Sequence, residues 1–200
     1  MIDDTFLTLQ NQSEGIYKEK GSRFLAFASP VKDEEEIKSK LTHLKKQYFT
    51  ARHYCYAYIL GKDKEIYRSN DDGEPGHSAG DPILGQIRSN NLTNVLIVVV
   101  RYFGGTKLGV GGLTTAYKTA AAEAIASNQI IIQTVTRAIK FNFGYADMNE
   151  VMRLVKENEL QILQTDYENK CIMSISAREA LADHLRFQLS QLPTLTILDP

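Results

Sequence analysis

A strand, a glycine-rich loop and a helix follow one another in the segment Asn94-Val-Leu-Ile-Val-Val-Val-Arg-Tyr-Phe-Gly-Gly-Thr-Lys-Leu-Gly-Val-Gly-Gly-Leu-Thr-Thr-Ala-Tyr117. The continuous β-branched run at residues 95–100 predicts a central strand that is buried on both faces. Beyond the glycines, helically spaced residues predict a helix whose alanines allow close packing against a sheet: Leu113, Ala116, Tyr117, Ala120, Ala121 and Ala124. The glycine loop, residues 103–112, therefore lies at the end of a buried strand and can hold a rigid site.

The glycine loop has the composition of an anion-binding site, because free backbone N–H groups and a helix N-terminus can converge on an anion. We predict a phosphate- or nucleic-acid-binding set: Arg101, Gly104, Gly105, Thr106, Lys107, Gly109, Gly111 and Gly112. A Walker A loop would need Lys and Ser or Thr after Gly109, and Thr114 replaces the third glycine of a dinucleotide fingerprint. The alternative is a tight turn whose glycines supply positive φ and let helix and strand approach each other.

Residues 71–81 form a second loop, the acidic loop, which is rich in carboxylates and turn formers. Paired carboxylates beside a histidine can act as acid and base or hold a metal, if the loop folds them inward. Asp-Gly and Pro-Gly are also ordinary turn dipeptides, and an aspartate can simply accept backbone N–H groups. We favour turn structure and predict no catalytic residue, metal or cofactor. The role of four residues stays open: Asp71, Asp72, Glu74 and Ser78.

The rest of the first half alternates strand and helix signals. Residues 14–20 and 23–31 predict one hairpin, and residues 54–60 and 65–69 predict a second. Asp33 can cap a helix between them, with an apolar stripe of Ile37, Leu41, Leu44 and Tyr48. Pro82 suits the first turn of a helix capped by Ser78 or Asp81, which would bury Ile83, Leu84 and Ile87.

From about Ser127 the pattern becomes strand, helix, strand, strand, helix, strand, which is the order of a ferredoxin-like domain. A strand with Ile139, Phe141, Phe143 and Tyr145 leads to a capping box, Asp147–Glu150, before a helix that buries Val151, Leu154 and Val155. Residues 162–167 and 171–176 predict a hairpin around Glu168-Asn169. Residues 176–179 cap a helix with Leu181, Leu185 and Leu189 inward, and residues 194–198 close the sheet.

That architecture also occurs in RNA-recognition modules, whose central strands stack bases on aromatic side chains. The strand at residues 170–176 lacks aromatic residues, and Phe141 and Phe143 have the parity expected for core. We therefore predict core packing for both. The predicted fold is α+β, with an N-terminal domain at residues 1–132 and a ferredoxin-like domain at residues 133–200.

Composition describes an ordinary globular chain of 200 residues with 43% hydrophobic residues. The formal net charge of −1 neither drives nor excludes non-specific nucleic-acid binding. No acidic residue occurs from Pro82 to Ala122, so the glycine loop lies in a locally positive segment. Cys55 and Cys171 fall in apolar stretches of different domains, which argues against a disulfide or zinc site. Without a leader-like start or a membrane-length apolar run, we expect a cytoplasmic protein with no membrane partner.

Four motifs resemble the YigZ/IMPACT family of uncharacterised proteins: Arg52-His-Tyr-Cys-Tyr-Ala57, Asp71-Asp-Gly-Glu-Pro75, Ala79-Gly-Asp-Pro-Ile-Leu84 and Val99-Val-Arg-Tyr-Phe-Gly-Gly-Thr-Lys-Leu-Gly-Val-Gly-Gly-Leu113. The resemblance covers the whole chain. It implies a two-layer α/β N-terminal domain like the second domain of a small-subunit ribosomal protein. It also implies a ferredoxin-like domain similar to the last domain of elongation factor G.

The resemblance implies a function in translation. Eukaryotic IMPACT proteins regulate translation initiation through a further N-terminal domain absent from this sequence, so that mechanism is not carried over. The likeness to ribosome-contacting domains suggests binding to RNA, the ribosome or a translation-related protein, by analogy of fold. The family pattern usually has Gly at the position of His77 and Thr at that of Ser78, which argues against a family-wide catalytic role for His77.

Three functions follow as expectations. The first is a non-enzymatic, translation-associated protein that contacts RNA or the ribosome through the glycine loop. The second is an enzyme acting on a small phosphorylated or peptide-like substrate, with the acidic loop as acid and base. The third is a protein–protein adaptor. A deep pocket where Glu74 and Lys107 converge would favour the enzyme, and an open basic surface would favour the binding module. The sequence leaves the oligomeric state open.

Overall fold

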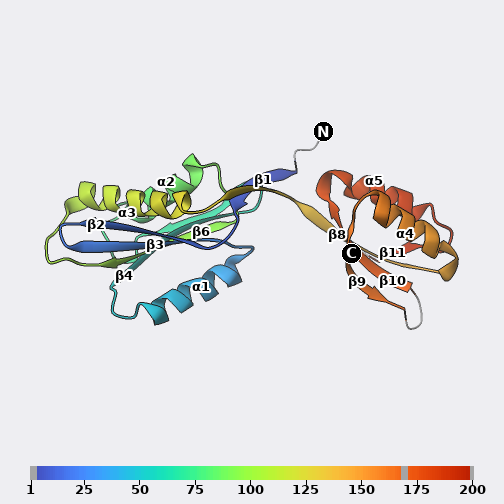
Figure 1. Ribbon diagram of the computed structural model, residues 1–200, viewed down its shortest axis with the longest axis horizontal. Coiled ribbons are helices and arrows are strands. Elements are labelled where there is room, and N and C mark those ends of the chain that lie inside the picture. Colours follow the sequence, from blue (N-terminus) through green and yellow to red (C-terminus); the bar gives the residue numbers. More distant parts are fainter. Residues whose placement is uncertain (1–3, 168–170, 199–200) are drawn as a thin grey trace. The chain divides into compact units, whose positions relative to one another are not determined.

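The computed structural model describes residues 4–167 and 171–198 and divides into two compact units (Figure 1). The N-terminal unit comprises Phe6–Gln133. The C-terminal unit begins at Thr134 and also includes Asp4 and Thr5. The sequence predicted a domain boundary between residues 132 and 133, with the start of the chain in the N-terminal domain. The structure instead groups Asp4 and Thr5 with the C-terminal unit.

The N-terminal unit is built on a five-stranded antiparallel sheet with the strand order β2-β3-β6-β4-β5. The strands are β2 (Ser13–Glu19), β3 (Ser22–Pro30), β4 (His53–Leu60), β5 (Ile66–Asn70) and β6 (Val95–Tyr102). Both predicted hairpins are confirmed. β6 is the central strand, and its first seven residues are buried, which explains its unbroken apolar run.

Helices cover both faces of this sheet (Figure 1). On one face, α1 (Glu34–Gln47) packs on a cluster that includes Phe27, Leu96 and Val98. Its N-terminus is capped by Asp33 as predicted, because Asp33 Oδ1 accepts from Glu36 N at 2.8 Å. On the other face lie α2 (Gly80–Ser89) and α3 (Gly109–Ala126). The α+β class holds, but the unit has three layers where two were expected, because α1 covers the second face.

Small residues let α3 lie close to the sheet. Ala116, Ala120 and Ala124 are fully buried, as the sequence predicted. Gly15 of β2 approaches so closely that an added Cβ would lie 2.4 Å from Ala124 N. Ser13 Oγ also donates a hydrogen bond to Ala124 O at 2.6 Å. These contacts fix the axis of α3 and therefore the position of its N-terminus.

The sequence did not predict two further strands. β1 (Thr5–Leu9) pairs with β7 (Ile130–Thr134) in a separate two-stranded sheet.

Within the described residues, no helix combines the length and the apolar composition that a membrane span needs.

The C-terminal unit is ferredoxin-like, as predicted. Its elements are β8 (Thr136–Phe143), α4 (Met148–Glu157), β9 (Gln161–Asp166), β10 (Cys171–Arg178), α5 (Glu179–Ser190) and β11 (Thr196–Ile197), with the sheet order β11-β8-β10-β9. Phe141 and Phe143 belong to the core, which confirms the prediction against base stacking. β9 and β10 pair as predicted, and the expected turn at Glu168-Asn169 lies outside the described residues.

Local details of this unit differ from the prediction. The carboxylate of Asp147 caps no helix, because its Oδ2 accepts from Thr194 N at 2.9 Å and from Thr194 Oγ1 at 2.6 Å. Tyr145 lies in a 3₁₀ turn (Tyr145–Asp147) and is 71% exposed. Residues 176–178 belong to β10 and cap no helix, and Leu181 is 40% exposed while Ala182 faces the core. At Asp147 a tertiary contact with Thr194 therefore replaces the predicted capping box.

Candidate functional site

The glycine loop joins β6 to α3, and three of its glycines have a structural reason. Gly104 packs on the β2–β3 turn, where an added Cβ would lie 1.9 Å from Gly21 C, and its N–H donates to Ser22 Oγ at 3.1 Å. Gly105 and Gly109 have φ values of +88° and +73°, which favour glycine. The predicted tight turn, in which glycines supply positive φ or close backbone approach, thus explains Gly104, Gly105 and Gly109. It leaves Gly111 unexplained, since nothing lies within 4 Å of a Cβ added there.

The N-terminus of α3 is open. Leu108 precedes the helix and offers no side-chain cap, and the first turn contains no acidic residue. By contrast, carboxylates cap the N-termini of α1 and α2. The first N–H groups of a helix need partners, and the helix dipole adds partial positive charge there. This N-terminus therefore attracts anions.

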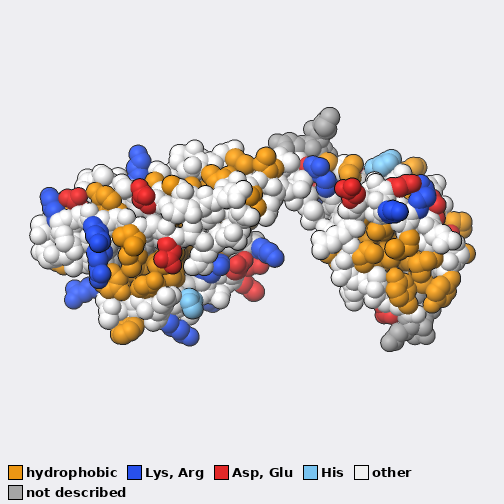
Figure 2. All heavy atoms as spheres, in the orientation of Figure 1, with side chains coloured by type: hydrophobic (Ala, Val, Ile, Leu, Met, Phe, Trp, Pro, Cys, Tyr) orange, Lys and Arg blue, Asp and Glu red, His pale blue; other side chains and the backbone are white. Residues whose placement is uncertain are grey.

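Basic side chains surround this N-terminus. Lys107 and Thr106 are exposed in the loop itself. The β2–β3 turn, against which Gly104 packs, adds the exposed Lys20 and Arg23. Several Lys or Arg side chains lie at this end of the N-terminal unit, the left end in the view of Figures 1 and 2. The end of the sheet that holds the glycine loop is thus locally positive.

Asp71 of the acidic loop caps α2. Its Oδ1 accepts from Ala79 N at 2.9 Å and from Gly80 N at 2.8 Å, and its Oδ2 accepts from His77 N at 2.9 Å. The predicted caps, Ser78 and Asp81, do not cap α2 and make other hydrogen bonds. Ser78 is buried and its Oγ donates to Pro75 O at 2.6 Å. Asp81 accepts from Ser69 Oγ at 2.6 Å and lies 2.6 Å from His77 Nδ1.

Asp72 also stabilises the turn of the acidic loop. Asp72 and Gly73 have φ values of +40° and +85°, and Glu74 N donates to Asp71 O at 2.9 Å, as in a type I′ turn. Asp72 Oδ2 accepts from Tyr54 N at 2.7 Å. Among the described residues, no three His, Cys, Asp or Glu side chains are grouped to hold a metal ion. The two aspartates therefore act as backbone acceptors, the role that the sequence favoured.

His77 has a backbone conformation that glycine adopts more readily than other residues. Its φ is +63°, in the left-handed region. The hydrogen bond and charge of Asp81 raise the pKa of the exposed His77 imidazole. Hydrogen bonds from Ser69 and His77 lower the pKa of Asp81. This pair lies on the surface of the acidic loop.

Glu74 and Arg101 join the two loops through a buried ion pair. Arg101 Nη1 lies 2.6 Å from Glu74 Oε1, and the two side chains are only 7% and 4% exposed. Tyr117 of α3 donates its hydroxyl to the same oxygen at 2.7 Å. This corrects the prediction that Arg101 is an outward phosphate contact, because its guanidinium is buried against Glu74.

Cys55 extends this network. Its Sγ lies 3.3 Å from Tyr117 Oη and 3.0 Å from the carbonyl oxygen of Asp71. Burial raises the pKa values of both the Cys55 thiol and the Tyr117 hydroxyl. Both groups are therefore neutral hydrogen-bonding partners in the core. A buried neutral thiol is a poor nucleophile, which excludes Cys55 as a reactive cysteine.

A pocket of about 330 Å³ opens where the two loops meet. Glu74, Arg101 and Lys107 contribute charged groups to its lining. Apolar walls come from Pro75, Phe103, Leu108, Val110 and Leu113. Glu74 and Lys107 thus converge on a pocket, which is the feature expected of a small-molecule site, and its volume suits a small ligand.

Sequence reasoning missed part of this site. Tyr117 was assigned to the core from its helical spacing, and its hydroxyl partner was not foreseen. The pocket walls Phe103, Leu108 and Val110 were also not singled out. One usable signal was Tyr117 itself, because a buried tyrosine among alanines needs a partner for its hydroxyl.

Comparison with known proteins identifies the family. Residues 20–125, more than half of the chain, match the Impact N-terminal domain. This chain belongs to the IMPACT family. The IMPACT family member YvyE of Bacillus subtilis (strain 168) is 31% identical over 163 residues, which cover 82% of this chain and 75% of YvyE. The IMPACT family member YigZ of Escherichia coli (strain K12) is 29% identical over 161 residues, 78% of each chain.

A solved structure shares the fold. The crystal structure of a hypothetical protein aligns with 100% of this chain and 98% of its own, with a TM-score of 0.76 and 24% identity. At that identity the likeness describes the architecture alone.

Proposed function

We propose that this IMPACT family protein is a translation-associated binding protein that contacts RNA or the ribosome through the glycine loop. The observation that carries the proposal is the uncapped, exposed N-terminus of α3 beside Lys107. Phosphate groups suit such a site, because the free N–H groups, the helix dipole and the ammonium all favour negative charge. Family membership supports the link to translation.

In this proposal some residues contact the partner, and others hold the two loops in position. Lys107, Lys20 and Arg23 are exposed and can approach a nucleic-acid backbone, together with the N–H groups around Gly111 and Gly112. Arg101 and Glu74 hold the glycine loop to the acidic loop from inside. Asp71 and Asp72 brace the acidic loop through backbone hydrogen bonds. A partner would meet the exposed Lys107, Lys20 and Arg23 beside the pocket that Glu74 and Lys107 line, and the network of Arg101, Glu74, Asp71 and Asp72 would hold the two loops behind them.

Co-sedimentation with ribosomes and with free RNA across a salt series tests this proposal. We expect salt-sensitive binding by the wild type and weaker binding by Lys107→Ala. Lys156→Ala, an exposed lysine of the C-terminal unit, is the matched control and should bind like the wild type. Absence of binding at low salt, or equal binding by all three proteins, would overturn the proposal.

The pocket between the loops supports a second candidate function, the binding or conversion of a small phosphorylated or peptide-like ligand. Lys107 and the N-terminus of α3 would receive an anionic group, and the apolar walls would cover the rest. Glu74 is the acidic-loop carboxylate that lines the pocket. A thermal-shift screen of phosphorylated metabolites and short peptides tests this candidate. A stabilising ligand should lose its effect in Val110→Trp, which fills the pocket mouth, and no stabilisation by any compound would count against it.

A further inference from the structure

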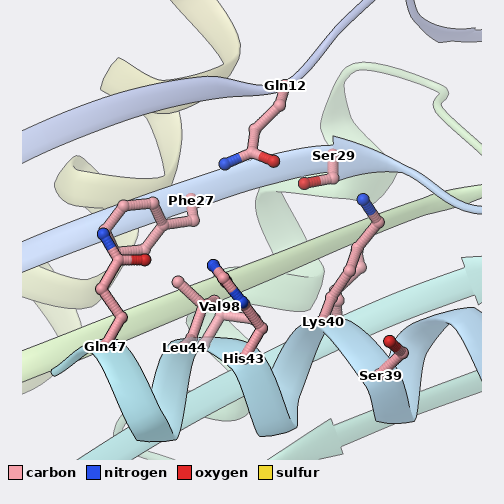
Figure 3. A pocket seen from close by; sticks show the side chains of 10 residues that line it. Gln12, Phe27, Ser29, Ser39, Lys40, His43, Leu44, Gln47 and Val98 are labelled. Atoms are coloured by element: carbon pink, nitrogen blue, oxygen red, sulfur yellow. The ribbon is translucent and has the colours of Figure 1, made fainter. Parts of the chain in front are cut away.

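Two exposed apolar side chains flank the N-terminus of α3, on the walls of the pocket between the glycine loop and the acidic loop. Phe103 is 55% exposed and Val110 is 56% exposed. Both line this pocket, which therefore offers accessible apolar surface directly beside the uncapped helix N-terminus. The pocket between α1 and the sheet, shown in Figure 3, differs in this respect, because its Phe27 and Val98 are buried.

The ring of Phe103 packs on a buried cation. Arg101 Cζ lies over this ring, 5.5 Å from its centroid, and Glu74 holds the guanidinium in place through the buried ion pair. An aromatic ring that contacts a fixed guanidinium has a defined orientation. Because more than half of Phe103 is exposed, the ring offers accessible surface to a flat partner.

Arg101 also has an unsatisfied hydrogen-bond donor. Its side chain is 7% exposed and lines the pocket, and its Nε has no hydrogen-bond partner within the described residues. Buried N–H groups are rarely left without an acceptor. Since Glu74 already neutralises the guanidinium, the acceptor that suits Nε is a neutral oxygen such as a carbonyl. A molecule in the pocket that carries such an oxygen would supply it.

Lys107 is the free cation of this site. Its side chain is exposed and makes no ion pair within residues 4–167 and 171–198. By contrast, Lys40 Nζ of the pocket in Figure 3 already lies 3.6 Å from Glu36 Oε1. The ammonium of Lys107 and the open N-terminus of α3 can therefore both contact a phosphate group. The site thus combines a phosphate position, an exposed aromatic ring and a donor for a neutral oxygen.

An unpaired nucleotide of RNA carries groups that complement all three features. Its phosphate suits Lys107 and the helix N-terminus, its base can stack on Phe103, and a carbonyl on the base edge can accept from Arg101 Nε. A paired nucleotide cannot do the same, because its neighbours in the duplex cover the faces of its base and unstacking costs free energy. A duplex would therefore contact this surface through its phosphates alone.

We propose that the glycine loop recognises unpaired nucleotides of single-stranded RNA, with a base packed on Phe103 and Val110 and its phosphate at Lys107 and the N-terminus of α3. This inference rests on the proposed function, and it adds the form of RNA that is bound and the side chain that selects it. Phe103 determines the specificity, because stacking needs an accessible base face, which a duplex covers.

Fluorescence anisotropy with three labelled RNA probes of equal length tests the proposal. The probes are a strand of uridines, the same strand without its bases and a duplex. We expect Phe103→Leu to weaken binding of the uridine strand by about fivefold or more, the effect of one lost stacking contact. Duplex binding should stay unchanged. The strand without bases should bind the wild type and Phe103→Leu equally, because it has nothing to stack.

Two further variants show whether the effect belongs to the ring of Phe103. Phe103→Tyr keeps an aromatic ring and should retain the wild-type affinity for the uridine strand. Phe187→Leu replaces an exposed phenylalanine of α5, in the C-terminal unit, and should bind every probe like the wild type. Circular dichroism checks that each variant is folded.

The outcomes separate this inference from the proposed function. If Lys107→Ala weakens RNA binding and Phe103→Leu does not, the phosphate contacts stand and the stacking inference is overturned. It is also overturned if Phe103→Leu weakens binding of the uridine strand and the duplex equally, or if the wild type binds the uridine strand no better than the strand without bases. Absence of binding to all three probes at low salt would overturn both.

Discussion

At the scale of single residues, the centre of the N-terminal unit is a chain of hydrogen-bonded polar groups. Arg101, Glu74 and Tyr117 come from β6, the acidic loop and α3, and they meet at one carboxylate oxygen, Glu74 Oε1. Arg101 also lies over the rings of Phe24 and Phe103, 5.4 Å and 5.5 Å from their centroids. Removing one partner from a buried pair leaves the other charge uncompensated. The position of both loops therefore depends on these three side chains.

Glu74→Ala should lower the free energy of unfolding by about 3–5 kcal/mol, because it leaves the Arg101 guanidinium buried without a counter-charge. Urea denaturation followed by circular dichroism measures this loss. Glu65→Ala removes an exposed carboxylate and should change stability little. A loss below about 1 kcal/mol for Glu74→Ala would show that the pair behaves like an exposed one.

The same ion pair marks a limit of sequence reasoning. Glu74 and Arg101 are 27 residues apart, and each looked like a solvent-facing functional group when considered alone. Only the register of the sheet and the type I′ turn at Asp72-Gly73 bring their side chains together. Arg101→Glu is consequently unsuitable as a test of RNA binding, because it would place two carboxylates in one buried site.

At the scale of elements, local signals predicted the helices and hairpins but not all of their ends. The hairpins and the cap of α1 depend on residues close in sequence, and they were predicted correctly. Asp71 caps α2 from eight residues before Ala79, and Asp4 accepts from Ala180 N of α5 at 3.3 Å. β1 and β7 pair across more than a hundred residues. Such contacts follow from the tertiary fold and leave no local pattern.

The glycine loop gives a paired prediction at this scale. Gly104→Ala should lower the free energy of unfolding by about 1–3 kcal/mol, because the new Cβ meets the backbone of Gly21 and Ser22. Gly111→Ala should preserve or raise stability, since its site is open and alanine is the better helix former. Thermal unfolding measures both effects.

A measurement of RNA binding gives a further prediction for Gly111. If the N–H groups at the start of α3 contact phosphate, the methyl group of Gly111→Ala obstructs that approach and weakens binding severalfold in a stable protein. Wild-type affinity in Gly111→Ala would remove this helix N-terminus from the contact surface.

At the scale of the whole molecule, Asp4 and Thr5 belong to the C-terminal unit although they lie far from it in the sequence. The carboxylate of Asp4, which is buried, lies 2.7 Å from Arg178 Nη2. Asp4 O also accepts from Val135 N at 2.7 Å. The hydrogen bond from Arg178 lowers the pKa of the Asp4 carboxyl below its ordinary value of 3.8. Asp4 thus stabilises the C-terminal unit through contacts with residues more than a hundred positions away in the sequence.

This ion pair predicts a dependence of stability on pH. A carboxyl whose pKa is lower in the folded state stabilises that state above its unfolded pKa, and the stabilisation disappears as pH falls through the folded pKa. The unfolding free energy of the wild type should therefore exceed that of Asp4→Asn near neutral pH, and the difference should shrink below about pH 4. Acid titration of both proteins under urea measures it. A difference independent of pH would contradict the ionic role of Asp4.

The most direct test of the proposed function is the salt dependence of RNA binding by the wild type and Lys107→Ala. If the glycine loop contacts phosphate, log K should fall linearly with log salt concentration for the wild type. The slope for Lys107→Ala should be shallower by about 0.7–0.9, the value of one lost phosphate contact. Identical slopes and affinities, or no RNA binding at low salt, would contradict a role of this loop in binding RNA.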